Sequence, residues 1–341
     1  MMINQKLFDH YKIDTKKNLA IPKKCGRPFD TILIDKFGNC YACECTAWLP
    51  QSIGNIQVQT IDQILQSPQR KHLQNSILDK TYRYCNQAQC SYLNTYTQPA
   101  LDDESTPGYI PRKKKAFTIR LAVDDSCNLQ CPSCRQKRIF VSRGPVLNRK
   151  RKWIDKIVKW IDAQTRKIII VIGSDGDPFA SLIYRYFMLC AEQHKWKHVT
   201  YQFQTNGLLI KKMYNRYRWV FDRTDVVNIS MDGSDAEVYE QLRLGGNFKQ
   251  LCDNMTFLKQ IKRNFKVHLH MVVQKTNWQQ MPAVLEMCDT YGFEQVYFNL
   301  IQDWTTGLDI KEQTQFTGLV EYKAIKAQLA KHPLAEVCQL P

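Results

Sequence analysis

No hydrophobic run in this sequence approaches the roughly 20 apolar residues that a membrane-spanning helix needs. The first stretch, MMINQKLFDHYKIDTKK, lacks the apolar core of a secretion signal. Internal repeats and extended low-complexity segments are missing as well. These absences exclude membrane-spanning and repeat proteins, and they lead us to expect a cytoplasmic protein with no membrane partner.

Acidic residues are scarce relative to basic ones. The chain has 32 Asp and Glu against 48 Lys and Arg, which leaves a formal net charge of +16. Such an excess favours anionic partners, including nucleic acid, through electrostatic steering and counterion release. Solvated lysine faces would give the same count, so the charge alone does not choose between these interpretations.

Length and cysteine content limit the number of domains and the chemistry to expect from the thiols. At roughly 150 residues per domain, 341 residues suggest about two domains, and 44% hydrophobic residues are enough for a sizeable core. A disulfide framework is not expected in a reducing compartment, so the thirteen cysteines indicate metal ligands, reactive thiols or small core residues. Nine of the thirteen precede residue 135, which concentrates any metal chemistry there.

Six β-branched and aromatic runs in the second part of the chain predict strands, with helical stretches between them. One such stretch, RKRKWIDKIVKWIDAQ, places its apolar residues on one helical face. This alternation predicts a parallel sheet with right-handed crossovers, closed or partly closed as a barrel, with its chemistry at the carboxyl ends of the strands. The predicted strands cover residues 117–123, 167–173, 199–205, 226–231, 266–274 and 295–301.

Residue composition and periodicity along the chain predict four segments. Residues 1–95 hold cysteines, short strands, a turn at KFGN and a helix near 60–78, which is typical of a small α+β domain. Residues 96–115 mix Pro, Gly, Ser and acidic residues without periodicity, as linkers do. The barrel is expected over 116–305, and a helical extension over 306–341.

Three cysteines crowd into the stretch CNLQCPSC, directly after the first predicted barrel strand. Thiolates of Cys127, Cys131 and Cys134 at this spacing can hold an iron–sulfur cluster and leave one iron without a protein ligand. A structural zinc site would need a fourth Cys or His nearby, and none follows closely. An iron–sulfur cluster is therefore the leading interpretation, with zinc or core thiols as alternatives.

This loop resembles the signature of radical S-adenosylmethionine (SAM) enzymes, a C-x3-C-x2-C motif after the first strand of a partial (β/α)6 TIM-like barrel. The resemblance spans most of residues 115–305. It implies a [4Fe-4S] cluster whose free iron binds SAM, and cleavage of SAM to methionine and a 5'-deoxyadenosyl radical that takes hydrogen from a substrate. It also implies an electron donor such as flavodoxin or ferredoxin.

A turn after the second predicted barrel strand strengthens this resemblance. GSDGDPF is similar to the Gly-Gly-Glu-Pro turn of the family, which implies that Gly176 and Asp177 hold the SAM amino group. Glycine permits a close approach, and a carboxylate suits an ammonium group. The family's Glu is replaced by the shorter Asp177, and a plain Asx-Pro turn is the alternative.

The ends of the third and fourth predicted strands carry QTNGLL and SMDGSDAEVYEQLRLGGNF. The second string is similar to a stretch of peptide-modifying radical SAM enzymes, which implies that Ser230 and Asp232 lie near the ribose. It also implies that Arg243 pairs with the SAM carboxylate, and Asn206 is expected in the same pocket. Each motif alone resembles an ordinary turn, but their order on successive strand ends gives them weight together.

The cysteines of the first segment resemble the SPASM or twitch modules that bind auxiliary [4Fe-4S] clusters in radical SAM enzymes. Six thiols suit one auxiliary cluster better than two, and a zinc ribbon is the alternative. The module precedes the barrel here, whereas it follows the barrel in better-known enzymes, and we expect it to cap the barrel mouth. The best ligand set is Cys25, Cys43, Cys85 and Cys90, with Cys45 and then Cys40 as substitutes for Cys43.

Two further features remain open. His268 and His270 alternate on one strand and so share a face, for packing or for substrate. Residues 135–152 contain eight basic residues and no acid. The last four basic residues of this segment, 149–152, are expected at the start of a helix, where positive charge opposes the helix dipole. We therefore expect them to bind an anionic part of the substrate. A solvated loop is the alternative.

The expected substrate is a peptide or protein, as is common for SPASM-bearing enzymes. Residues 1–24 are too short for a leader-binding domain, and the basic charge favours an alternative: a nucleotide, a nucleic acid base or a sugar phosphate. A hypothesis of another class is a non-catalytic zinc protein that binds nucleic acid.

Overall fold

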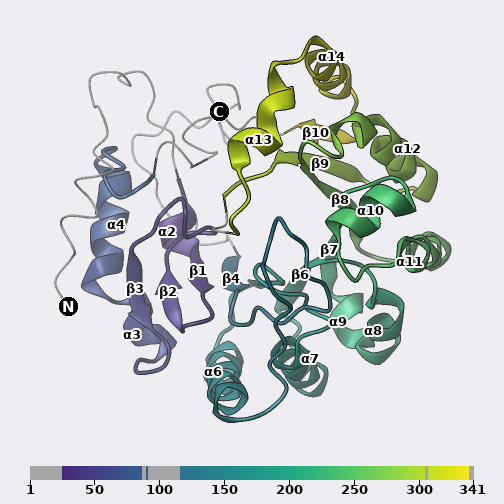
Figure 1. Ribbon diagram of the computed structural model, residues 1–341. Helices are drawn as coiled ribbons and strands as arrows, with labels where there is room; N and C mark the ends of the chain where they lie inside the picture. The colour runs from purple at the N-terminus through teal and green to yellow at the C-terminus, as the bar shows by residue number, and fades with distance from the viewer. Residues whose placement is uncertain (1–24, 87–89, 91–115, 304–305, 338–341) are drawn as a thin grey trace. The chain divides into compact units, whose positions relative to one another are not determined.

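The computed structural model describes residues 25–86, 90, 116–303 and 306–337 (Figure 1). Its contacts divide the chain into two compact units. The first joins residues 1–123 with 155–169, and the second joins 124–154 with 170–340. The predicted linker 96–115 lies outside the described residues, and the predicted domain boundaries stay a prediction.

The first unit contains a small mixed sheet. Its strands run in the order β4 (Phe117–Leu121), β1 (Thr31–Ile34), β2 (Asn39–Tyr41) and β3 (Ser52–Asn55). β1 pairs parallel with β4, whereas β1 with β2 and β2 with β3 are antiparallel. The predicted turn joins β1 to β2. There Asp35 accepts backbone hydrogen bonds from Phe37 and Asn39 at 2.8 Å, and Gly38 adopts a left-handed φ of +82°.

Between residues 25 and 86 the described part of this unit has three short helices, α2 (Arg27–Asp30), α3 (Ile61–Leu65) and α4 (Pro68–Leu78). The single helix expected near 60–78 is therefore two. Ser67 caps α4 by accepting from the Arg70 amide, and Pro68 occupies the first helical position. Because proline cannot donate a backbone hydrogen bond to a preceding turn, it starts a new helix here and does not continue α3.

The second unit contains a parallel sheet, as the sequence predicts. Its strands run in the order β5 (Ile168–Ile172), β6 (Val199–Thr205), β7 (Thr224–Ser230), β8 (Lys266–Val273), β9 (Gln295–Leu300) and β10 (Ala335–Val337). β5 begins in the first unit and ends in the second. Every successive pair from β6 to β10 is parallel. The six predicted barrel strands are found as β4 to β9, and β10 is an addition that the sequence analysis did not predict.

Helices alternate with these strands (Figure 1). Phe203 of β6 packs on Phe221 of α9 with ring centroids 5.6 Å apart, so one sheet face meets the helices. None of the described helices combines the length and apolar character needed to cross a membrane. The helical segments are α6 (Pro145–Asp162), α7 (Leu182–His194), α8 (Ile210–Arg216), α9 (Arg218–Asp222), α10 (Ala236–Leu242), α11 (Phe248–Gln260), η1 (Trp278–Gln280), α12 (Met281–Tyr291), α13 (Ile310–Thr314), η2 (Gln315–Gly318) and α14 (Val320–Leu329).

The two faces of strands β6 to β9 differ in chemistry. Residues on the helix-facing side are buried and apolar, whereas those between them are only partly buried and mostly polar. Register aligns these polar positions in rows across the strands, as in the row Gln204, Asn228 and His268. The partly buried polar positions are Thr200, Gln202, Gln204, Asn228, Ser230, His268, His270, Gln295, Tyr297 and Asn299.

Candidate functional site

The three cysteines of the CNLQCPSC loop lie together in the second unit. Cys127 and Cys131 are buried, at 9% and 6% exposure, and Cys134 is exposed. Burial raises the pKa of Cys131 to about 11, although Arg243 opposes the shift. The pKa of Cys131 also responds to both other thiols, which are therefore its near neighbours.

Hydrogen bonds to three separate segments hold this loop. The Asp177 amide donates to the Ser126 carbonyl at 3.0 Å. The Gln130 amide donates to the Leu244 carbonyl at 2.9 Å, beyond α10. The Cys127 amide donates to the Ile139 carbonyl at 3.0 Å. The loop is thus fixed by the ends of β5 and α10 as well as by its own downstream segment.

The turn at Gly176 and Asp177 packs directly against the cysteine loop. A Cβ atom on Gly176 would lie 2.6 Å from the Ser126 carbonyl oxygen and 2.8 Å from that of Asp124, so only glycine fits. The Asp177 side chain is 2% exposed. One oxygen accepts from the Phe179 and Ala180 amides at 2.9 and 3.0 Å.

The other Asp177 oxygen accepts from the Thr205 hydroxyl at 2.7 Å and from the Asn206 amide at 2.9 Å. Burial raises the pKa of Asp177, and these hydrogen bonds oppose the shift. A carboxylate has about four acceptor sites, and four donors already use them. The structure therefore places Asp177 at the site as a clamp between two strand ends, and its predicted contact with SAM stays a prediction.

Asn206 extends from the end of β6 toward the cysteine loop. Its side-chain nitrogen lies 2.9 Å from the Asn128 side-chain oxygen and 3.8 Å from the Cys127 sulfur. Its side-chain oxygen accepts from the Leu208 amide at 3.1 Å. The structure brings this predicted residue to the cluster loop. Asn128, which the sequence analysis did not single out, joins it there.

Asp232 and Arg243 contact each other. The Arg243 Nε lies 2.7 Å from the Asp232 Oδ2, although these atoms are not aligned as a hydrogen bond. Burial works against the charged form of Arg243, but Asp232 and then Cys131 outweigh it and raise its pKa. An Arg243 Nη1 lies 3.9 Å from the Cys131 sulfur. Both residues lie at the site. The contacts predicted for them, Asp232 near the ribose of SAM and Arg243 with its carboxylate, stay predictions.

Ser230 and the two histidines lie on the polar face of the sheet. The Gln204 side chain donates to the Ser230 hydroxyl at 2.8 Å. The Tyr297 ring lies beside both His268 and His270, with centroids 5.6 and 4.6 Å away. Burial, then His268 and Arg243, lower the pKa of His270 to about 4, so this imidazole is neutral at ordinary pH.

The basic segment differs from expectation. Helix α6 begins at Pro145, so residues 149–152 lie beyond its first turn and the helix-dipole argument fails. Lys150 is 4% exposed, and its Nζ lies 2.8 Å from the Asp124 carboxylate, which also accepts from the Ser181 hydroxyl at 2.7 Å. Arg151 stacks on Tyr186, 5.3 Å from the ring centroid. The prediction that Lys150 binds substrate is wrong.

Four of the six thiols in the first unit affect one another. Burial and then Cys90 raise the pKa of Cys25, which reaches about 11. Besides burial, Cys25 and Cys90 raise the pKa of Cys43, and Cys25, Cys90 and Cys43 raise that of Cys85. Every pair among these four thiols is thus electrostatically coupled.

Cys40 stands apart from that group. It is fully buried, and its sulfur donates to the Gly38 carbonyl at 3.7 Å. Burial and Asp35 raise its pKa to about 12, with no contribution from another thiol. Cys45 contributes its backbone amide to the Cys43 sulfur. The assignment of Cys25, Cys43, Cys85 and Cys90 as ligands stays a prediction.

Both thiol groups fit iron–sulfur chemistry by donor type. Among the described residues, no three His, Cys, Asp or Glu side chains already gather tightly around one metal position. A [4Fe-4S] cube binds each thiolate through a different iron, so it needs its ligands further apart than a single zinc ion does. In the second unit, Arg135 and Arg243 also lie close to the sulfurs, where positive charge favours thiolates.

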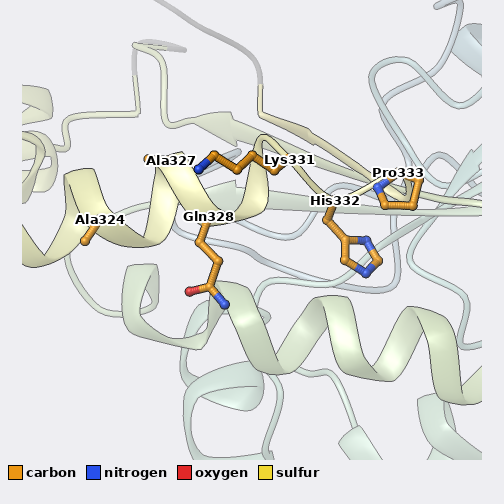
Figure 2. Close-up of a pocket in the computed structure, with 6 residues that line it drawn as sticks. All are labelled: Ala324, Ala327, Gln328, Lys331, His332 and Pro333. Carbon is orange, nitrogen blue, oxygen red and sulfur yellow. The ribbon is translucent and has the colours of Figure 1, made fainter.

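A surface depression of about 460 Å³ lies elsewhere in the second unit, beside α14 (Figure 2). None of the predicted SAM-site residues lines it, and we assign it no chemistry. The lining residues are Ala324, Ala327, Gln328, Lys331, His332 and Pro333.

Comparison with known protein families decides the class. Residues 123–288 match the radical SAM superfamily, and residues 25–91 match the iron–sulfur cluster-binding SPASM domain. The chain thus contains a radical SAM domain. Its SPASM domain precedes the radical SAM domain, as the sequence resemblance implies.

Curated relatives of this chain include two proteins from Methanococcus maripaludis, strains C7 and C5, each described as a probable GTP 3',8-cyclase. They are 26% and 25% identical over 181 residues. These matches cover 51% of this chain and 56% of the relatives, so the chain matches a little over half of their length.

Similar solved structures include SuiB of Streptococcus suis bound to the precursor peptide SuiA. Its TM-score is 0.47 at 15% identity, over 66% of this chain and 49% of that one. Another is anSMEcpe with bound AdoMet, with a TM-score of 0.40 at 20% identity, over 55% of this chain and 50% of that one.

Proposed function

We propose that this enzyme reductively cleaves SAM and uses the resulting radical to abstract hydrogen from a peptide or protein. Cys127, Cys131 and Cys134 would hold a [4Fe-4S] cluster, which when bound supplies the electron that cleaves SAM. The observation that carries this proposal is the packing of the Gly176 turn against the Asp124 and Ser126 carbonyls, which directly precede Cys127 in the cysteine loop.

Each predicted side chain has a role in this proposal. The carbonyl groups of the turn at Gly176 meet the SAM ammonium, and the saturated Asp177 carboxylate holds that turn in place. Arg243 has five donors, so it can bind the SAM carboxylate while it remains next to Asp232. Asn206 and Ser230 complete the polar wall of the pocket.

A second iron–sulfur cluster belongs to the proposal. We assign its ligands to Cys25, Cys43, Cys85 and Cys90, because these thiols are mutually coupled and Cys40 is not. The auxiliary cluster is then one [4Fe-4S] cluster in the SPASM domain.

The polar face of the sheet supports a peptide substrate. Between β6 and β9, its partly buried positions carry amides, hydroxyls and a neutral imidazole, and no Lys or Arg. Such groups suit the amide groups of a peptide better than a phosphate, which is bound most strongly by cationic donors. A nucleotide is the second candidate, because the curated relatives are described as probable GTP cyclases.

Anaerobic reconstitution with iron and sulfide tests the enzyme activity. With dithionite and SAM, we expect 5'-deoxyadenosine and methionine in equal amounts, measured by liquid chromatography. Zinc in place of iron in the purified protein, with no 5'-deoxyadenosine formed, would favour the nucleic-acid-binding zinc protein.

The substrate class is tested by isotope transfer. Deuterated peptides encoded by neighbouring genes and deuterated GTP are offered in parallel to the reconstituted enzyme. We expect deuterium in 5'-deoxyadenosine from a peptide, and transfer from GTP alone would establish the nucleotide alternative.

A further inference from the structure

The segment after Cys134 folds back along the cysteine loop. The Gln130 side chain donates to the Gln136 carbonyl at 2.9 Å. The Val141 amide donates to the Ser126 hydroxyl at 2.9 Å, in addition to the bond between Cys127 and Ile139. Residues 136–141 are thus held beside the thiols by three separate hydrogen bonds.

The cations of this stretch fall into two groups. Arg135 binds internally, because its guanidinium donates to the Asp175 carbonyl at 2.8 Å and to the Cys134 sulfur at 3.3 Å. Lys137, Arg138 and Arg143 are exposed, and no carboxylate of the described residues forms an ion pair with them. Folding of the described part of the chain does not use their charge.

An aromatic side chain lies among these exposed cations. Phe140 is 50% exposed, although its neighbours Ile139 and Val141 are fixed by backbone hydrogen bonds. Cys134, a proposed cluster ligand, is also exposed, so the cluster would lie closest to solvent on this side of the loop. Exposed aromatic and arginine side chains are enriched at protein interfaces, and here Arg138, Phe140 and Arg143 follow one another along one short exposed segment.

We propose that Lys137, Arg138, Arg143 and Phe140, the electron-entry patch, dock an acidic one-electron carrier protein. The inference rests on the proposed [4Fe-4S] cluster at Cys134. One electron passes from the reduced carrier, which is oxidised, to the cluster, which is reduced, and no bond forms or breaks between the two proteins. Electron-transfer complexes bury small areas, below about 1,200 Å², so a patch of this extent is sufficient.

Charge complementarity selects the partner. Flavodoxins and ferredoxins as a class present acidic surfaces, and opposite charges steer association and raise the on-rate at low salt. An anionic substrate would need the same cations, but then their loss would affect SAM cleavage only when that substrate is present. The two uses are therefore separable by experiment.

The test replaces Lys137, Arg138 and Arg143 with Gln in the full chain. The matched control replaces Lys197, Lys262 and Lys266 with Gln, which removes the same charge at exposed positions before β6, before β8 and at the first residue of β8. Binding of oxidised flavodoxin is measured by surface plasmon resonance. We expect the patch variant to bind at least about tenfold more weakly at 50 mM salt, and the control within about twofold of wild type.

A second measurement separates the carrier from the chemistry. With reduced flavodoxin as donor, the patch variant should form 5'-deoxyadenosine more slowly, and with dithionite it should match wild type. Equal flavodoxin affinity in all three proteins, or equal weakening in the patch and control variants, would overturn the docking site. Loss of dithionite-driven cleavage in wild type would instead contradict the proposed enzyme activity, and the binding measurement would still decide the docking site.

Discussion

Lys150 shows how one residue in a charged run acquires a different role from its neighbours. Its ammonium group is buried against Asp124, which directly precedes the cysteine loop and also accepts from Ser181. The Tyr184 hydroxyl donates to the Asp124 carbonyl at 2.9 Å and so fixes its backbone. A buried ion pair adds little net stability, but removal of one partner leaves an uncompensated charge.

We therefore predict that Lys150→Met destabilises the protein by about 3–5 kcal/mol. The measurement is the urea midpoint followed by circular dichroism. Lys152→Met, at an exposed position in the same helix, is the control and should change stability by no more than about 0.5 kcal/mol. Equal effects of the two substitutions would mean that Lys150 does not form this pair in solution.

The burial of Lys150 had a signal in the sequence. The predicted buried face of the helix includes Ile154, Ile157 and Ile161, and Lys150 lies four residues before the first of them. Pro145 after Gly144 also marks the true helix start. By contrast, nothing local identifies Asp124 and Ser181 as its partners, because they come from segments that only the fold brings together.

At the scale of elements, the site depends on one turn packed against one loop. The turn after β5 contributes Gly176, whose missing side chain leaves room for the carbonyls of residues 124 and 126. Those carbonyls belong to backbone and cannot move away without moving the cysteines. Asp177 then ties the same turn to the end of β6.

Gly176→Ala should displace the loop and lower the iron content. We expect the reconstituted variant to fall from about eight irons per chain toward about four, because the loop cluster is lost and the auxiliary cluster is not. Iron analysis and visible absorbance measure this. Gly318→Ala is the control, since a Cβ there meets nothing within 4 Å. Full iron content in the Gly176 variant would show that the loop tolerates the shift.

The strands were easier to predict than the details of this packing. Alternating β-branched and aromatic residues give a period-two pattern that finds β6 to β9 within a few residues. The saturation of Asp177 was not predictable, because its donors come from two separate strand ends. The motif resemblance singled out Asp177, but only the fold shows that its carboxylate already accepts four hydrogen bonds.

At the scale of the whole molecule, the cysteines form two separate groups. The loop thiols lie in the second unit, and the coupled thiols Cys25, Cys43, Cys85 and Cys90 lie in the first. The loop group was predicted from spacing, and the second group from a family resemblance that ranked Cys43 above Cys40. Both of these residues are buried, but only Cys43 is coupled to other thiols, Cys25 and Cys90. The ligand set itself stays a prediction.

Replacement of Cys127, Cys131 and Cys134 together by Ala should leave about four irons per chain and abolish formation of 5'-deoxyadenosine. Cys85→Ser should show the converse loss of the auxiliary iron, whereas Cys40→Ser should keep both clusters. Electron paramagnetic resonance of the reduced proteins distinguishes the two clusters. An iron-free triple variant would mean that the first unit holds no iron cluster.

The short strand β10 affects whether the edge of the sheet can pair with another chain. It pairs parallel with β9 through residues 335–337, so the backbone amides and carbonyls on that side of β9 are occupied. A long unpaired strand at a sheet margin is a template for another chain, and proteins commonly protect it with a short final strand. β10 is only three residues long and carries Glu336 at its centre, which makes it a poor template itself. In the described sheet β10 thus leaves no long unpaired strand beside β9, which disfavours edge-to-edge pairing with another chain.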